Sequence, residues 1–455
     1  MKSPLITNMG KNEIEGKIIF LRGCADVPLD KKKDAYDITR IRDTTKVDAL
    51  LSTLDFLVEN DAKIVLQPGW LGRPEGIQKE LSTITIFLYI KKHLQEKNLL
   101  KHEMIMAPSD LGGEIRSISQ NFDIVEERIS KLQDGQVLVL ENPRFDPEYN
   151  KGDQEYAKKM ASFVDYYVAE DFAHRHRPAS DIIHTPKNLP TFMGTQLFKE
   201  VESLENVIRI LDNKKRKPFS LILAGKKIET KPGITSKMTV ALNLLDRMIP
   251  HDKILVGGAV AYTFLVAKSL DLDELNEDKI KGIVGESYLK WDNIDEQVRL
   301  AKDVLNKAKE NGIEIVLPED HVIRNNETKE FKTNQKKIPL GWQGVDIGSE
   351  TVQKFNSILD ESGLIVMAGP VGMFDKPDVT AISNNSQEIV RKMGELTKKG
   401  VITISAGGES TFLVNNIGTS VTHASIGGGA TLEFIEKGTL EGLEVLNKPN
   451  MKIQA

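Results

Sequence analysis

Glycine-rich turns follow the apolar runs in the second half of the chain, and two lysines stand just past the first of these turns. The turns are LAGKK at Leu223, VGGA at Val256, AGPVG at Ala368, SAGGES at Ser405 and IGGGATLEF at Ile426. A helix expected from about residue 431, closed by a glycine at 438, places Gly427, Gly428 and Gly429 at its N-terminus, where backbone NH groups favour phosphate oxygens. Lys227 and Lys231 could neutralise a transferring phosphoryl group. This combination predicts phosphate chemistry.

A single glycine turn is more often an ordinary tight turn than a ligand site, but five such turns in one half favour ligand binding. Neither GxxxxGK[ST] nor a GxGxxG after a first strand is present, which disfavours a P-loop enzyme and a dinucleotide fold. For a generic lysine pair a solvated surface is the ordinary interpretation. Here the position after a glycine turn favours a functional role.

Short apolar runs separated by helical patterns must position these residues. Each run is too short for a buried helix and stops at Gly, Pro or a polar residue. Strands that alternate with helices predict parallel sheets, and ten or more strands exceed one ordinary sheet. The polar segment 325–337 is expected to be an exposed loop. The predicted strands are KIIFLRG, KIVLQP, MIMAP, VLVLEN and DYYVAE in the first half, and FSLILAG, KILVGG, EIVLP, LIVMAG, ITISAG and THASIGGG in the second.

Composition excludes several classes of protein. The net charge of −5 and the dispersed basic residues do not favour a nucleic-acid surface. Cys24 is the only cysteine, so neither an intrachain disulfide nor a cysteine zinc cluster can form. The N-terminus lacks the apolar core of a signal peptide, and no stretch approaches the ~20 apolar residues of a membrane span. We expect a cytoplasmic protein without membrane segments.

Seven motifs resemble those of the phosphoglycerate kinase family and occur in that family's order. They are LGRP at Leu71, ENPRF at Glu141, HRPAS at His176, AYTF at Ala261, GWQGVDIG at Gly341, AGPVGMFD at Ala368 and IGGGATLE at Ile426. The resemblance implies an α/β protein with two doubly wound, Rossmann-like parallel-sheet lobes joined by a connecting helix at 198–212. It assigns residues 1–197, with the tail 440–455, to binding phosphoglycerate, and residues 198–439 to binding the magnesium nucleotide.

The resemblance also assigns roles in the nucleotide half. Lys227 matches the lysine that stabilises the transferring phosphoryl group, and Lys231 matches one that contacts nucleotide phosphates. Glu409 stands where the family places an Asp at the magnesium nucleotide, so it is the expected contact to Mg²⁺. Gly428 and Gly429 are expected to take part in catalysis. The remaining expected nucleotide contacts are Gly225, Gly257, Gly258, Asp375, Gly407 and Gly408.

The acid-binding half departs from the family pattern. Where the family has Asp and Asn in an Arg-x-Asp-x-Asn-x-Pro segment, this chain has Cys24 and Asp26. A carboxylate at the second position should repel an anionic acid unless it is paired or protonated. Trp70 replaces a family His and is expected only to fill a wall of the cleft.

Arginines suit the distal phosphate of the acid because their forked donors match its oxygens. Arg73, Arg144 and Arg177 match the family's cluster, with Arg175 as a rival for the third place.

The residue that serves as the catalytic cation also has two candidates. When the chain is aligned with the family forward from PLD, the family's catalytic arginine falls on Arg40. When it is aligned backward from LSTLDFL, that position falls on Lys46. We prefer Arg40 because the four residues 39–42 match the family's Thr-Arg-Ile-Arg.

Three hypotheses follow from these residues. The first is a phosphoglycerate kinase that uses ATP or ADP with Mg²⁺ and a small phosphorylated carboxylic acid, as a monomer. The second is a paralogue that phosphorylates another acid, motivated by Cys24, Asp26 and Trp70. The third is a nucleotide-binding protein without kinase activity, which the retained arginines disfavour.

Overall fold

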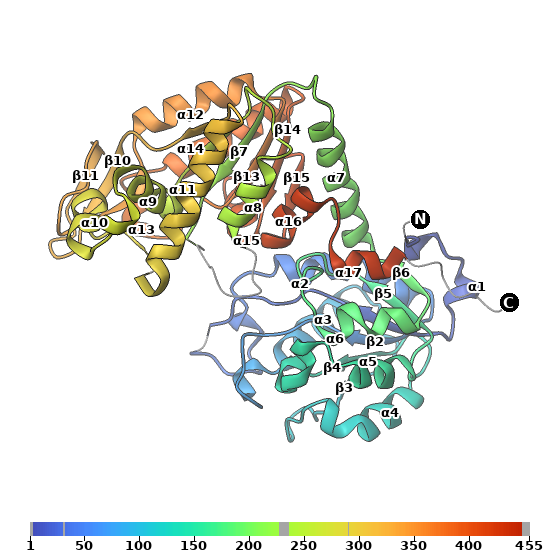
Figure 1. The fold of residues 1–455 in the computed structure, drawn as a ribbon. Helices are drawn as coiled ribbons and strands as arrows, with labels where there is room; N and C mark the ends of the chain where they lie inside the picture. The colour runs from blue at the N-terminus through green and yellow to red at the C-terminus, as the bar shows by residue number, and fades with distance from the viewer. Residues whose placement is uncertain (1–2, 31, 227–235, 290, 448–455) are drawn as a thin grey trace. The chain divides into compact units, whose positions relative to one another are not determined.

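The computed structural model describes residues 3–30, 32–226, 236–289 and 291–447. The chain forms two compact units, one of residues 1–202 with 439–455 and the other of residues 203–438 (Figure 1). This boundary lies slightly later along the chain than the one expected from the sequence, which is after residue 197. Among the described residues, no helix is long and apolar enough to cross a membrane.

A parallel six-stranded sheet forms the centre of the first unit, with strand order β3-β4-β2-β1-β5-β6. Its strands are near-continuous apolar runs because helices cover both faces. The strands are β1 (Ile18–Arg22), β2 (Lys63–Gln67), β3 (Ile105–Ala107), β4 (Val137–Leu140), β5 (Tyr166–Ala169) and β6 (Thr191–Met193). The helices are α1 (Lys11–Ile14), α2 (Thr45–Glu59), α3 (Ile84–Glu96), α4 (Phe122–Ser130), α5 (Gln154–Ala161), α6 (Ser180–Ile183) and α17 (Glu441–Glu444).

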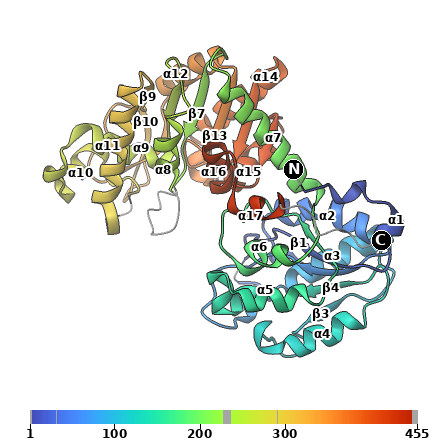
Figure 2. The same cartoon turned by 45° about the vertical axis from the view of Figure 1, so that its right-hand side comes forward.

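Alternate side chains of this sheet pack on opposite layers. Helices α2 and α3 lie against this sheet (Figure 2). Ile19 of β1 and Ile64 of β2 belong to the core that also includes residues of α2 and α3. On the other face Phe20 stacks on Tyr167 with ring centroids 5.6 Å apart, and the Tyr167 hydroxyl donates to the carbonyl of Asp181 in α6 at 2.8 Å. The carboxyl ends of β1, β2 and β5 therefore lie at one edge, where ligands bind in open α/β sheets.

The C-terminal segment packs within the first unit. The NH of Gly442 in α17 donates to the carbonyl of Arg175 at 2.8 Å, and the Thr191 hydroxyl donates to the carbonyl of Leu446 at 3.1 Å. A Cβ at position 442 would lie 2.6 Å from the Arg175 carbonyl oxygen, so this approach requires glycine.

The second unit repeats the plan with a parallel sheet of order β15-β14-β13-β7-β8-β9. Helices α12, α14 and α15 share a core with one face, and α8, α9, α11 and α16 form the neighbouring helical layer. The sheet strands are β7 (Phe219–Leu223), β8 (Lys253–Val256), β9 (Glu314–Val316), β13 (Leu364–Ala368), β14 (Ile402–Ala406) and β15 (His423–Ser425). The helices are α8 (Lys237–Leu244), α9 (Gly258–Ser269), α10 (Glu277–Val284), α11 (Ile294–Glu310), α12 (Ser349–Glu361), α13 (Pro377–Thr380), α14 (Asn385–Lys398), α15 (Gly408–Asn416) and α16 (Gly429–Lys437).

The predicted fold class is confirmed, and each apolar run predicted as a strand forms one. The prediction of a loop at residues 325–337 was wrong. That segment contributes β11 (Phe331–Gln335) to a small antiparallel sheet with β10 (His321–Asn325) and β12 (Trp342–Ile347). Its backbone is paired while most of its side chains face water, so the apolar pattern that marks a buried strand is absent.

Helix α7 (Thr195–Asp212) includes the expected connecting helix, and Glu170 caps its N-terminus. The Glu170 carboxylate accepts hydrogen bonds from the Thr53 hydroxyl at 2.6 Å and from the NH groups of Gln196 and Leu197 at 3.2 and 3.3 Å. A Cβ at Gly194 would come within 2.0 Å of the carboxylate. Burial raises the pKa of Glu170 to about 7, although these hydrogen bonds oppose the shift.

We expect the free energy of unfolding of the Glu170→Gln variant to lack the pH dependence that titration of Glu170 gives to the wild type. The folded chain holds the Glu170 proton more tightly than the unfolded chain, in which glutamate titrates near 4.5. The stabilising contribution is therefore complete below that value and is lost as the pH rises through about 7, by on the order of 3 kcal/mol. Denaturant unfolding of wild type and variant across this range checks the prediction, and equal slopes against pH in the two proteins would contradict it.

Candidate nucleotide site and candidate acid site

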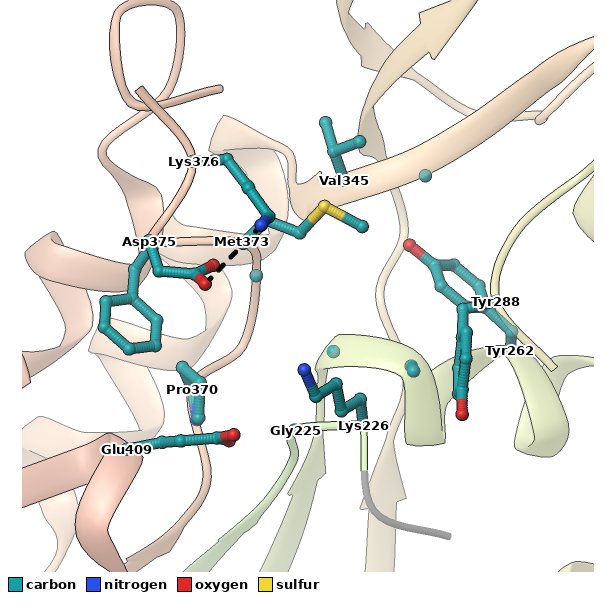
Figure 3. A pocket seen from close by; sticks show the side chains of 15 residues that line it. Gly225, Lys226, Tyr262, Tyr288, Val345, Pro370, Met373, Asp375, Lys376 and Glu409 are labelled. Carbon is teal, nitrogen blue, oxygen red and sulfur yellow. Dashed lines mark ion pairs between the residues drawn. The ribbon is translucent and has the colours of Figure 1, made fainter. Parts of the chain in front are cut away.

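A pocket of about 180 Å³ lies at the carboxyl ends of strands in the second unit (Figure 3). The residues that line it come from the turn after β7, the first half of α9, the segment after α10, β12, the segment after β13 and the first turn of α15. They include Gly225, Lys226, Gly258, Ala259, Tyr262, Tyr288, Val345, Pro370, Met373, Asp375 and Glu409. The predicted residues Gly225, Gly258, Asp375 and Glu409 therefore share one cavity.

Glycines allow three chain segments to meet at this pocket. Gly258 has φ +58°, and its NH donates to the carbonyl of Val371 at 2.8 Å. A Cβ on Gly258 would lie 2.7 Å from the backbone nitrogen of Gly225 and 2.9 Å from the carbonyl oxygen of Pro370. A Cβ on Gly257 would lie 2.7 Å from Val371. The turn after β8 thus packs backbone to backbone against the turns after β7 and β13.

Two helix N-termini lie side by side near β14 and β15. Gly407 precedes α15 with φ +102°, and Gly428 precedes α16 with φ +54°. A Cβ on Gly407 would lie 3.2 Å from the Cα of Gly428, so the two predicted glycine turns are adjacent. Gly408 and Gly429 are the first residues of these helices, and the NH groups at the N-terminus of a helix suit an anion such as a phosphate.

The two lysines predicted to act on the phosphates, Lys227 and Lys231, lie outside the described residues. Lys237, which the sequence analysis did not select, begins α8 directly after its cap Ser236. Its Nζ donates to the carbonyls of Ala224 at 2.6 Å and Ala368 at 2.7 Å, at the ends of β7 and β13. The available signal was Ser236, a residue type that caps helix N-termini, directly before Lys237.

Two carboxylates, those of Asp375 and Glu409, line the pocket. Asp375 lies 3.9 Å from Lys376, and Glu409 projects from the first turn of α15 (Figure 3). Asp346 is buried behind the pocket, where burial raises its pKa to about 6 although its hydrogen bond from the Ser383 hydroxyl at 2.7 Å opposes the shift. Asp346 is a scaffold residue, whereas Asp375 and Glu409 are open to a ligand.

The candidate acid site of the first unit rests on a buried ionic network. Arg22 is fully buried, and its Nε donates to Asp181 at 2.8 Å while a second nitrogen lies 3.4 Å from Asp171. The Tyr149 hydroxyl donates to Asp181 at 2.5 Å. This network holds the end of β1, from which the Cys24 and Asp26 segment begins.

Asp26 lies at the centre of a cluster of reactive side chains in the first unit. Its Oδ1 lies 2.7 Å from Nζ of Lys46, 3.4 Å from Nε2 of His174 and 3.2 Å from Sγ of Cys24. Partial burial by itself would raise the pKa of Asp26, but His174 and Lys46 lower it well below its usual range. Burial lowers the pKa of His174 to about 3, so its ring is neutral at pH 7, and burial raises the pKa of the Cys24 thiol.

The structure brings Lys46 to these residues but not Arg40, the cation that the sequence analysis preferred. Arg40 is 1% exposed, and it donates to the carbonyl of Glu80 at 2.9 Å and to the Thr85 hydroxyl at 3.5 Å. Lys46 lies in the first turn of α2 and faces Asp26. Arg40 therefore lies in a buried contact outside this cluster, and its catalytic role stays a prediction.

The four arginines that the sequence offers for the distal phosphate also differ in their surroundings. Arg144 lies over the Trp70 ring at 4.1 Å, and burial together with the charges of Arg73 and Arg177 lowers its pKa to about 10. Arg175 is fully buried, and it bonds Asp171 and the Tyr167 hydroxyl. Arg73, Arg144 and Arg177 thus form a cluster of positive charge that would attract an anion, while Arg175 supports the fold.

Trp70 is 5% exposed and stacks on His174 with ring centroids 3.9 Å apart. It separates the arginine cluster from the Asp26 cluster and fixes the orientation of the imidazole.

Two parallel-sheet units, one with a glycine-lined pocket and one with clustered guanidinium groups, define a two-domain α/β phosphotransferase. The family model described as phosphoglycerate kinase matches residues 9–438. A phosphoglycerate kinase of Thermosipho africanus is 34% identical, with 97% of this chain and 98% of that protein covered, and one of Nostoc punctiforme is 32% identical, with 98% and 100% covered. The crystal structure of phosphoglycerate kinase from Pyrococcus horikoshii is 23% identical, covers 97% of this chain and 98% of that one, and superposes with a TM-score of 0.73, which is a likeness of fold.

The chain belongs to the phosphoglycerate kinase family. Its activity is that of an ATP-dependent phosphotransferase.

We expect Gly258→Ala to weaken nucleotide binding by at least about tenfold, because the added Cβ displaces the backbone at Gly225 or Pro370 and the positive φ adds about 1–3 kcal/mol of strain. Isothermal titration with ATP measures this. Gly282 in α10 has open space around it and serves as the matched control. Gly282→Ala should bind ATP normally and gain about 0.5–1 kcal/mol of stability. Normal ATP affinity in Gly258→Ala would contradict the assignment.

Proposed function

We propose that this chain transfers a phosphoryl group between magnesium ATP and the carboxylate of 3-phosphoglycerate, giving ADP and 1,3-bisphosphoglycerate. One observation carries the choice of acid: Arg73, Arg144 and Arg177 form a positive cluster in the same unit as Asp26 and Lys46. The cluster suits the distal phosphate of the acid, and the remaining groups suit the acid's other end.

In this proposal the chain positions and neutralises the reacting groups, and it needs no general base. A carboxylate is already ionised at neutral pH, so it can attack the terminal phosphate in line. Lys46 supplies the positive charge in the acid half. In the nucleotide half the N-termini of α15 and α16 and the ammonium of Lys237 favour phosphate oxygens. Lys227 and Lys231 keep the roles that the family resemblance gives them.

Mg²⁺ enters with the nucleotide as part of the substrate. Glu409 and Asp375 are carboxylates open to the pocket, and oxygen ligands are those that Mg²⁺ prefers. We propose Glu409 as the contact to the magnesium nucleotide, with Asp375 available to the ribose. A cytoplasmic monomer remains our proposal for the form and location of the protein.

The altered acid site can accept an anion because its added charge is compensated. Asp26 adds a negative charge where the family has Asn, and the ammonium of Lys46 offsets it at 2.7 Å. Cys24 is an uncharged thiol where the family has Asp. The charges of Asp26 and Lys46 therefore offset each other. The cluster does not repel the anionic acid in the way that the sequence alone predicts for Asp26.

We expect Lys46→Ala to lower kcat with 3-phosphoglycerate by at least about a hundredfold, because one cation next to the reacting carboxylate is lost. Arg40→Leu should instead lower the denaturant midpoint, since Arg40 is buried and hydrogen bonded. A coupled assay of ADP formation, with circular dichroism as a folding control, measures both.

Two outcomes of this assay would count against the proposal. Unchanged kcat in Lys46→Ala would remove Lys46 from the reaction. Wild-type protein that binds ATP but does not turn over 3-phosphoglycerate would overturn the choice of acid, and other small carboxylic acids would then be assayed.

A further inference from the structure

Cys24, Asp26 and His174 bring a thiol, a carboxylate and an imidazole together within 4.8 Å of one another. Cys24 and Asp26 come from the segment after β1, whereas His174 comes from the segment after β5. These strands are neighbours in the sheet, so the cluster forms only in the folded first unit.

The separations within this cluster match those of a tetrahedral metal site. The Sγ of Cys24 lies 3.2 Å from Oδ1 of Asp26 and 3.8 Å from Nε2 of His174, and the last two atoms are 3.4 Å apart. A tetrahedral zinc with ordinary bond lengths to sulfur, nitrogen and oxygen places such ligand atoms roughly 3.3–3.6 Å apart. Small side-chain shifts would therefore close the three ligands around one ion.

The carboxylate of Asp171 lies next to the second ring nitrogen of His174. Oδ2 of Asp171 is fully buried and lies 3.4 Å from the Arg22 guanidinium and 3.8 Å from Nδ1 of His174. A histidine that binds metal through Nε2 commonly donates its Nδ1 proton to such a carboxylate. Arg22, which can only donate, lies 3.5 Å from the same Nδ1, so metal binding through Nε2 requires the ring proton to move from Nε2 to Nδ1 and the Arg22 contact to be lost.

We propose that Cys24, Asp26 and His174 form a binding site for Zn²⁺ or a similar thiolate-binding divalent ion, with the fourth position open to water or to a carboxylate oxygen. As the metal–sulfur bond forms, the thiol proton leaves to water, and no atom changes oxidation state. Asp26 would bind the metal through Oδ1, the oxygen that now lies 2.7 Å from Nζ of Lys46, so metal binding requires the ammonium to move to Oδ2. The site is distinct from the magnesium nucleotide, because Mg²⁺ prefers oxygen ligands and does not favour a thiolate.

Cobalt(II) titration of the full-length, chelator-treated protein tests the site directly. Cys24 is the only cysteine, so a thiolate-to-cobalt charge-transfer band can come from this position alone. We expect a band that saturates at one cobalt per chain, shows tetrahedral ligand-field absorption, is displaced by Zn²⁺ and is unaffected by excess Mg²⁺.

Variants separate this site from a thiol that binds cobalt by itself. His174→Gln should weaken cobalt binding at least tenfold, and Asp171→Asn by about 10–100-fold through the supporting contact. His102→Gln, a change in the loop between α3 and β3, should bind as wild type. No charge-transfer band in folded wild-type protein would overturn the proposal, and so would equal cobalt affinity in wild type and a folded His174→Gln variant.

Discussion

The proposed acid site depends on the ion pair between Asp26 and Lys46. A carboxylate in a pocket for an anion repels its ligand, and only a nearby cation can offset this. The Lys46 ammonium does so at 2.7 Å. Burial alone would lower the pKa of Lys46, but the neighbouring acidic groups raise it, so both partners stay charged at neutral pH.

The surrounding structure holds the two partners of this pair in place. Lys46 is fixed by the first turn of α2, whose apolar face belongs to the core of the first unit. Asp26 follows β1, and the buried network of Arg22, Asp171 and Asp181 holds the end of that strand. Trp70 stacks on His174 and limits the movement of the ring next to Asp26. The pair is therefore positioned by two separate elements of one packed sheet.

The sequence predicts the parallel sheets well and the small antiparallel sheet poorly, for one physical reason. Strands covered on both faces are apolar throughout, whereas β11 is paired through its backbone and presents mostly polar side chains to water. The glycine turns were predictable because backbones must pass at close range, as at Gly258.

Choices between neighbouring charged residues could not be made from the sequence. Arg40 and Arg175 match family motifs as well as Lys46 and Arg177 do, and only their burial and hydrogen bonds separate the two sets. The contact between Cys24 and His174 was also beyond sequence reasoning, since it joins residues 150 positions apart. Lys237 was missed because its contacts depend on where α8 begins.

Calorimetric binding of 3-phosphoglycerate to wild type, Lys46→Met, Asp26→Asn and the double variant tests this charge compensation most directly. Loss of Lys46 alone leaves Asp26 unpaired, so binding should weaken by about tenfold or more, equivalent to about 1.4 kcal/mol. Removing Asp26 as well should restore much of the affinity. Lys46→Met binding as tightly as wild type, or a double variant no better than Lys46→Met, would contradict the account.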